Sequence, residues 1–268
     1  MMTSAATERP RAPLARLLWR HLGNELRRAF YLQRRYWFEA LLGVAMVLGL
    51  FGGLVLAVLS ATGKGLDSGE ADGLIVGFVV WLFAAAAFQS ASNDVQQETE
   101  QRTLEQLCLA PLPLWALLSL RALLQVGGGL LLLLPSLLLL EWLTDGRLPL
   151  PYGPVLGATL LAAPALIGLG YAVAGLLLLV KRGELMMAAT FPLVIGLVAL
   201  PAYPLNALAG LPYALGAAAA RAAAAGAQLP PAVYGWILLN SVAYLLLGLV
   251  TYAVLERRAR RLGVLGHF

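Results

Sequence analysis

Long apolar runs alternate with short polar connections along most of the chain. Six of these runs are long enough to cross a bilayer as a helix, which takes about 20 residues. The predicted spans lie near residues 41–60, 74–91, 122–140, 155–180, 185–205 and 234–255. The pattern predicts an all-α membrane protein whose six transmembrane helices occupy residues 41–255. Residues 1–40 and 256–268 flank this domain as polar ends.

The boundary between the fourth and fifth spans depends on a single tetrapeptide, Lys181-Arg182-Gly183-Glu184. A charge at mid-membrane costs at least about 2.5 kcal/mol on insertion scales. Three charges in four residues therefore indicate a turn at the membrane surface. Proline occurs inside both spans, as Pro164, Pro192 and Pro201. We expect these prolines to kink or break the helices, because proline removes a backbone hydrogen bond.

The basic residues give the chain a direction in the membrane. With both ends in the cytoplasm, 16 of the 19 Lys and Arg residues fall on the inner side, and only Lys64, Arg147 and Arg221 fall outside. The inner residues are Arg9, Arg11, Arg16, Arg20, Arg27, Arg28, Arg34, Arg35, Arg102, Arg121, Lys181, Arg182, Arg257, Arg258, Arg260 and Arg261. Because positive residues collect on the cytoplasmic side, the sequence predicts cytoplasmic N- and C-termini.

Composition narrows the chemistry. Of the 268 residues, 60% are hydrophobic and 12% are charged, against about 25% charged in soluble domains. The net charge of +5 follows from the positive-inside bias, so we expect no nucleic-acid partner. The single cysteine, Cys108, rules out an internal disulfide and a thiolate metal cluster.

The predicted spans carry no Asp, Glu, Lys or Arg near their middles, so we predict no catalytic and no metal-ligating residue. This pattern argues against a proton-coupled carrier and an integral membrane enzyme, which need ionisable groups at membrane depth. The polar residues within the spans are Gln89, Gln125, Ser136, Thr159, Tyr171, Thr190, Asn240 and Ser241. We expect them to join neighbouring helices by hydrogen bonds.

The basic N-terminal segment has helical amphipathicity. Leu14, Leu18, Leu22, Leu26 and Phe30 recur at helical spacing, which predicts an interfacial helix with its apolar side in lipid and its cations near the headgroups. The predicted interface residues are Arg16, Arg20, Arg27, Arg34 and Arg35. A basic tail that only fixes topology is a compatible alternative.

The cytoplasmic loop at residues 92–113 is polar at first, then amphipathic, and ends at two prolines. Its leucines predict a short surface helix ending at Pro111. We expect Asp94, Glu98, Glu100 and Glu105 to form the exposed acidic side of this helix. An ordinary solvated loop is the alternative.

Part of this loop is similar to a family signature. Thr103-Leu104-Glu105-Gln106-Leu107, followed by Ala110-Pro111-Leu112-Pro113, resembles the cytoplasmic signature of ABC-2 type transporter permeases, the type V exporters. Arg102 stands where the family usually has glycine. The basic ending at 256–265 and the boundary at 175–183 also resemble the family, so the likeness extends over nearly the whole chain.

The resemblance implies the membrane subunit of an ATP-driven exporter in the bacterial cytoplasmic (inner) membrane. Two copies of a separate ABC ATPase would bind ATP and Mg²⁺, and a second permease chain, identical or homologous, would complete the pathway. The loop would be the coupling helix that docks on the ATPase, through Glu98, Glu100, Thr103, Leu104, Glu105, Gln106, Leu107 and Pro111. The chain itself would be no enzyme and would bind no cofactor. It also lacks a P-loop: Gly63-Lys64 has neither the preceding glycine nor a following Ser or Thr.

Residues 206–233 form the predicted outer loop, whose alanine run at 217–225 predicts one or two short helices. In the family this region caps the exit of the pathway; a surface helix without a transport role is the alternative. Three other functions stay open: a haem-exporter-type permease of cytochrome c maturation, which has a similar loop and Pro-Leu-Pro, an integral membrane enzyme, and a membrane scaffold.

Overall fold

The computed structural model of the chain describes residues 14–62, 69–101, 103, 112–143, 151–180 and 184–263. All regular secondary structure in these ranges is helical. The chain divides into two compact units, Met1–Val44 and Ala45–Phe268. The first unit holds α1 (Leu14–Arg35) and the start of α2 (Trp37–Thr62).

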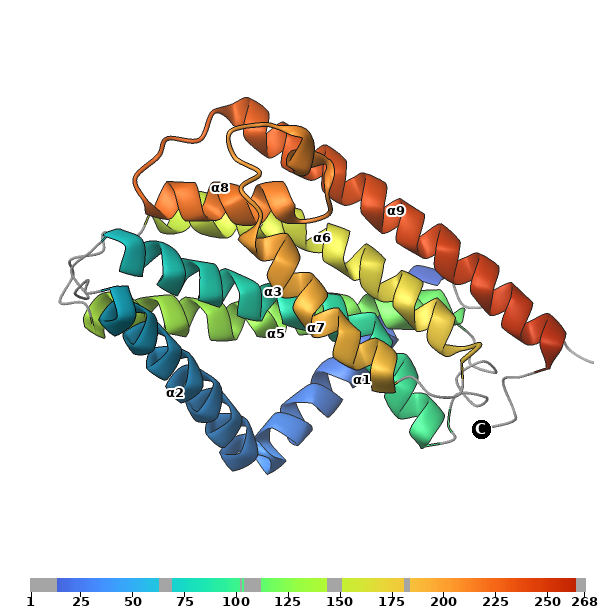
Figure 1. Cartoon of the computed structure of the whole chain (residues 1–268). Coiled ribbons are helices and arrows are strands. Elements are labelled where there is room, and N and C mark those ends of the chain that lie inside the picture. Colours follow the sequence, from blue (N-terminus) through green and yellow to red (C-terminus); the bar gives the residue numbers. More distant parts are fainter. Residues whose placement is uncertain are drawn as a thin grey trace, which may run out of the picture. The chain divides into compact units, whose positions relative to one another are not determined.

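The second unit is a helical bundle organised around α6 (Figure 1). Its elements, besides the rest of α2, are α3 (Gly69–Glu100), α5 (Leu114–Leu143), α6 (Tyr152–Leu177), α7 (Glu184–Ala199), the 3-10 helix η1 (Ala207–Gly210), α8 (Ala214–Ala224) and α9 (Pro231–Leu262). The most extensive contact joins α6 to α9, and α6 also packs on α3 and α8. In turn α3 packs on α5, α7 and α8. In the described bundle, most of the contacts between helices therefore involve α3 or α6.

Among the described residues, three helices are long and apolar enough to cross a membrane. They are Val76–Glu100, Tyr152–Leu177 and Pro231–Leu262, and they coincide with the second, fourth and sixth predicted spans. At 1.5 Å per residue, the 32 residues of α9 reach about 48 Å, well beyond the roughly 30 Å hydrocarbon core. The chain therefore has the character of a membrane protein, and α9 is longer than a crossing of the lipid tails requires.

Two helices end at other residues than the spans predicted for them. The second predicted span ends at residue 91, but α3 continues to Glu100, because its polar end contains no proline or glycine to stop the backbone hydrogen bonds. The fifth predicted span ends at residue 205, but α7 ends at Ala199. The residue before a proline disfavours helical geometry, and Leu200 precedes Pro201. The helix α6 runs unbroken through Pro164.

Small residues let the central helices approach closely. A Cβ added at Gly168 of α6 would overlap the backbone of Tyr244 and Leu245 in α9, and one at Gly248 would overlap the backbone of Gly168. Backbones at this distance leave no room for any side chain. Such contacts suit a membrane, where lipid is as apolar as the helix surface and close packing must drive association.

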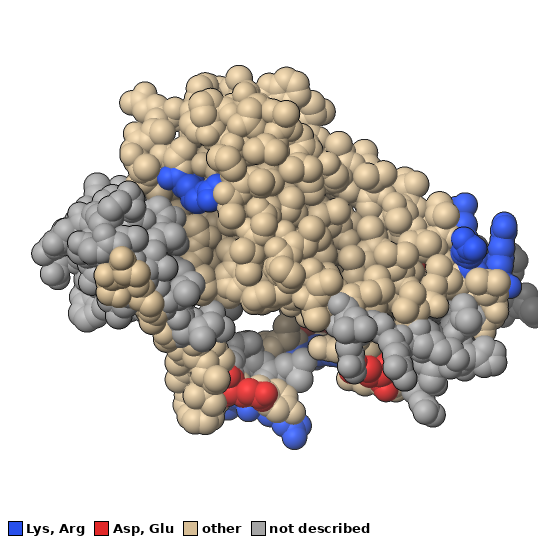
Figure 2. Space-filling view, in the orientation of Figure 1, with Lys and Arg blue, Asp and Glu red and all other residues tan. Residues whose placement is uncertain are grey.

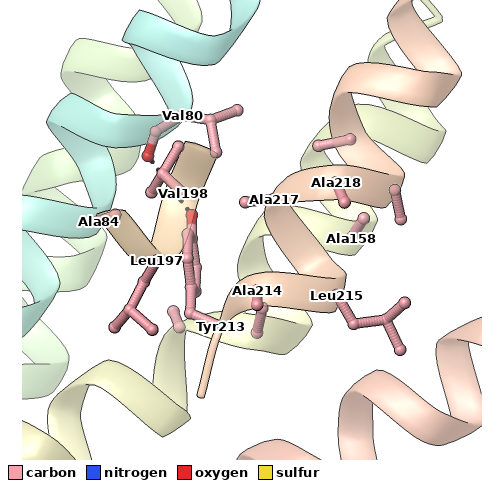
Figure 3. Packing of buried hydrophobic residues seen from close by; sticks show 14 of the residues in the cluster. Val80, Ala84, Ala158, Leu197, Val198, Tyr213, Ala214, Leu215, Ala217 and Ala218 are labelled. Carbon is pink, nitrogen blue, oxygen red and sulfur yellow. Dashed lines mark hydrogen bonds between the residues drawn. The ribbon is translucent and has the colours of Figure 1, made fainter. Parts of the chain in front are cut away.

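The alanine run forms a helix inside the bundle rather than on its surface. Every residue from Ala214 to Ala220 is buried, and Figure 3 shows the α8 side chains facing Val80 of α3, Ala158 of α6 and Val198 of α7. Tyr213 begins the helix in a left-handed conformation, with φ 67°. Its buried hydroxyl donates to the Val80 carbonyl at 3.4 Å. One or two short helices were predicted for this loop, and the structure has two, η1 and α8.

Charge is concentrated at the ends of the bundle. On the face shown in Figure 2, most of the bundle surface carries neither acid nor base, and basic side chains gather at the C-terminal end of α9. This helix ends at Gly263, which adopts the left-handed conformation, after Arg260 and Arg261 in its last turn. Cations at a helix C-terminus also stabilise the helix dipole.

Candidate functional site

A buried ion pair joins the end of α3 to the start of α5. Arg121 donates from Nη1 to Glu98 Oε1 at 2.8 Å, and the two side chains are only 12% and 11% exposed. Two opposite charges withdrawn from water need each other, because either one alone would lose its hydration without compensation. The pair therefore fixes how α3 and α5 meet at this end.

Helical periodicity brings both charges inward. On α3, Ala91, Val95 and Glu98 follow one another at steps of four and three residues, and all are buried. On α5, Leu114 and Leu118 are buried in the same register that leads to Arg121. Residues at this spacing share one helix face. Each charge therefore continues an apolar stripe that packs in the cluster between the two helices.

Thr103 attaches the following loop to this pair. Its backbone N–H donates to the Glu98 carbonyl at 2.9 Å, and its hydroxyl donates to the Glu98 carboxylate. At the other end of the loop, Leu112 and Leu114 are buried. Both ends of the segment between α3 and α5 are thus held against the bundle.

A second polar contact carries the connection on to α6 and α9. The hydroxyls of Ser119 in α5 and Tyr171 in α6 lie 2.7 Å apart, and the Tyr171 ring meets the Tyr252 ring of α9 edge to face, with centroids 5.6 Å apart. Tyr171, Tyr252, Ala91 and Leu118 belong to one buried cluster. This end of the bundle therefore ties α3, α5, α6 and α9 together. We call Glu98, Thr103, Arg121, Ser119 and Tyr171 the clamp.

The predicted coupling residues lie in different surroundings. The expectation that Glu98 belongs to an exposed acidic side was wrong, because its position on the apolar stripe turns it toward Arg121. Glu100 is exposed and accepts a hydrogen bond from Gln96 Nε2 at 2.8 Å. Thr103 is half-buried in the clamp. The remaining predicted residues, Leu104, Glu105, Gln106, Leu107 and Pro111, lie outside the described residues.

The start of the predicted loop helix is part of α3 and not of a separate helix. Residues 93–100 are the last two turns of α3, and Gln101 still donates to the Gln97 carbonyl at 2.9 Å. Residues 104–111, where the predicted helix would continue to Pro111, lie outside the described part of the chain.

Sequence reasoning missed Arg121 and Tyr171 as parts of a site. Arg121 counted only toward topology and Tyr171 only as a general interhelical contact. The available signal was the matching register of Ala91-Val95-Glu98 and Leu114-Leu118-Arg121, two apolar stripes that end in opposite charges. This signal becomes specific once α3 and α5 are known to be neighbours.

The predicted interface arginines lie on α1 in the first unit. Arg20, Arg27, Arg34 and Arg35 are exposed, and the Arg35 guanidinium stands 5.7 Å from the centre of the Tyr36 ring. The side chain of Arg16 lies outside the description. Their contact with lipid stays a prediction.

The clamp contributes hydrogen bonds and an ion pair between neighbouring elements. Among the residues that the structure describes, no group of three or more His, Cys, Asp or Glu side chains could hold a metal ion. The bonds of the clamp link α3, α5 and α6 to one loop, and the Tyr171 ring adds a contact with Tyr252 of α9. Comparisons with protein-family models, curated proteins and solved structures found no match for the chain.

Proposed function

We propose that the chain is the permease subunit of an ATP-driven ABC exporter. The observation that carries the proposal is the clamp at the root of the 102–113 loop, the segment with the permease signature. A force on this loop would reach α3 through Thr103 and Glu98, and α5 through Arg121 and Leu114. Through Ser119, Tyr171 and Tyr252 it would reach α6 and α9.

The proposal includes the finer architecture. The three helices that are long enough to span would be joined by α2, α5 and α7, to make six spans with both termini in the cytoplasm. The α7 helix, with 16 residues, reaches about 24 Å, so the turn after it and η1 would complete its passage. The α1 helix would lie in the cytoplasmic interface of a bacterial inner membrane.

The energy would come from another chain. Two copies of an ABC ATPase would bind ATP and Mg²⁺, close on each other, and push the docked loops of this permease and a second permease chain. The clamp would convert that push into a change among the helices behind it. The two arrangements of such helices need differ by only a few kcal/mol for ATP binding to shift one into the other.

Purification from native membranes tests the proposal. The tagged full chain should bring down a second protein that is labelled by 8-azido-ATP and hydrolyses ATP. Charge reversal in the signature, Glu105→Arg, and loss of its apolar contact, Leu104→Asp, should each reduce the co-purified ATPase about tenfold, because a mispaired charge at an interface costs several kcal/mol.

The matched control is Arg147→Glu, a charge reversal in the predicted outer connection before α6. It should leave the amount of co-purified ATPase unchanged. Absence of any nucleotide-binding partner from the intact chain would favour a scaffold instead. Full assembly and full ATP hydrolysis with both loop variants would overturn the docking assignment.

A further inference from the structure

A pocket of about 350 Å³ opens between the N-terminal half of α9 and the turn that leads into α8. Its apolar walls are the side chains of Leu205, Leu215, Leu239 and Trp236. Its polar side chains are Asn240 and Asn206, and the Asn206 Oδ1 already accepts from the Leu208 N–H at 2.9 Å. None of the residues that line it is charged. The pocket belongs to the second unit and shares no residue with the clamp.

Hydrogen bonds hold the wall of the pocket in place and leave one acceptor available. Asn240 donates from Nδ2 to the carbonyls of Ala209 at 3.3 Å and Gly210 at 3.1 Å, and Tyr244 donates its hydroxyl to Gly210 at 3.0 Å. These bonds orient the amide so that Oδ1 is the free atom. Among the described residues no donor bonds to this oxygen. An acceptor of this kind selects a ligand that carries an N–H or O–H group.

The surroundings of the pocket are apolar. Trp236 and Leu239 are more than half exposed, and Leu238, Val242, Leu246 and Leu247 on the same helix are also exposed. On a helix that is long and apolar enough to cross a membrane, such side chains face lipid. A tryptophan at the rim suits the level of the headgroups, where aromatic residues gather.

The position along α9 places the pocket in one leaflet. The basic end of the helix, Arg257 to Arg261, marks the cytoplasmic side by its charge. Asn240 lies 17 residues before Arg257, which corresponds to about 25 Å along the helix axis. Since the hydrocarbon core is about 30 Å thick, Asn240 lies near the opposite boundary, close to the level of lipid headgroups.

We propose that this pocket binds one phospholipid of the leaflet opposite the basic end of α9. An acyl chain lies against Leu205, Leu215 and Leu239, and a donor in the headgroup bonds to Asn240 Oδ1. Phosphatidylethanolamine has such a donor in its ammonium group, whereas phosphatidylcholine has none. The lack of charged lining residues means that this hydrogen bond, and not ion pairing, discriminates between them. The proposal does not depend on an ATPase partner.

Photolabelling tests the site. The full chain, with whatever it assembles with in the membrane, is placed in phosphatidylcholine nanodiscs. The probe is a trace of phosphatidylethanolamine with a diazirine in one acyl chain, and labelled residues are mapped by mass spectrometry. Label should concentrate on residues 205–215 and 236–243. The matching phosphatidylcholine probe should label these positions about tenfold less, the effect of losing one good hydrogen bond.

Two phenylalanine substitutions on α9 form a matched pair. Ala243→Phe places a bulky side chain at the pocket and leaves Asn240 and Tyr244 unsubstituted, and should reduce the label at the pocket about tenfold. Val250→Phe makes the same kind of change on an exposed part of α9 outside the pocket, and should leave the label unchanged.

Three results would overturn the proposal. The first is label spread evenly along the exposed face of α9, or unaffected by Ala243→Phe, which would mean ordinary surrounding lipid. The second is equal labelling by the two headgroups in the unchanged chain, a comparison that does not depend on how the variants fold. The third is an efficient disulfide between two copies of a Trp236→Cys variant without lipid label, which would mean that a second copy covers the pocket.

Discussion

The α6–α9 interface and the junction of α3 with α5 belong to the same bundle but are formed by different kinds of contact. Backbone meets backbone at Gly168 and Gly248, with no side chain between them. At the junction of α3 and α5, two apolar stripes end in an ion pair between the tips of two long side chains, Glu98 and Arg121. The first contact has one geometry available, because any separation loses close packing. The second contact can rearrange when a charge finds another partner.

Because of this difference, we expect the α6–α9 contact to be rigid and the α3–α5 contact to be the one that rearranges. The glycine contact makes α6 and α9 a rigid pair, in keeping with the dense packing of protein interiors. The clamp is attached to this pair through Tyr171 and Tyr252. In the proposed exporter, the loop would therefore move α3 and α5 against a fixed α6–α9 pair.

The largest expected effect comes from adding one methyl group to the rigid pair. In Gly248→Ala the new Cβ overlaps the Gly168 backbone, so the two helices must separate. We expect a loss of about 3 kcal/mol in unfolding free energy, the upper range of overpacking costs. Unfolding in mixed detergent micelles, followed by tryptophan fluorescence, measures it.

The same substitution at Gly235, also in α9, meets nothing within 4 Å. Gly235→Ala should be neutral or stabilise the helix by up to about 1 kcal/mol, because alanine favours helix more than glycine. Equal stability of the two variants would contradict the rigid-pair assignment.

An effect of similar size is expected at the clamp, and here a second mutation should rescue the first. Arg121→Met leaves the Glu98 carboxylate buried without its partner, and should cost about 3 kcal/mol. The double variant Glu98→Gln, Arg121→Met removes the isolated charge and should recover most of that loss. Unfolding free energies of the two single variants and the double variant give the coupling.

Glu100→Gln serves as the control, since Glu100 is an exposed acid two residues further along. It should change the unfolding free energy by less than about 0.5 kcal/mol. If Arg121→Met were as mild as this control, the ion pair would not hold α3 to α5.

The smallest effect is expected where the clamp joins the rigid pair. Tyr171→Phe removes the hydroxyl that bonds to Ser119 and keeps the ring against Tyr252. The expected loss is about 1 kcal/mol, the usual net value of one hydrogen bond. Combining it with Ser119→Ala in a double-mutant cycle should show that the two losses are not additive.

Additive losses from Tyr171→Phe and Ser119→Ala would mean that the two hydroxyls act separately. Tyr234→Phe provides a control on α9, because no described residue bonds to the Tyr234 hydroxyl. It should leave stability nearly unchanged.

Several features of the fold were predictable because they depend on one segment at a time. The apolar runs that became α3, α6 and α9 were visible in hydropathy, and the alanine run that became α8 in helix propensity. Boundaries were harder. The polar end of α3 reads as a loop, because hydropathy measures the preference of a segment for lipid and not its ability to continue a helix.

The candidate site was predictable only in part. The loop after α3 was identified, and Thr103 lies in the clamp as well as in the signature. The burial of Glu98 was not identified, since its acidic neighbours suggested a solvated face. Its partner lies 23 residues away, and an ion pair across that distance becomes visible only when two helix faces are known to meet.

The sequence by itself determined that this is a helical protein with membrane character and that its charges lie at the ends of the helices. Both follow from the transfer free energy of each segment between water and lipid, a sum over its own residues. The tertiary structure alone decided that Gly168 touches Gly248, that Glu98 meets Arg121, and that Asn240 faces a pocket with one free oxygen. These are properties of pairs of surfaces, and their free energies depend on which faces pack together.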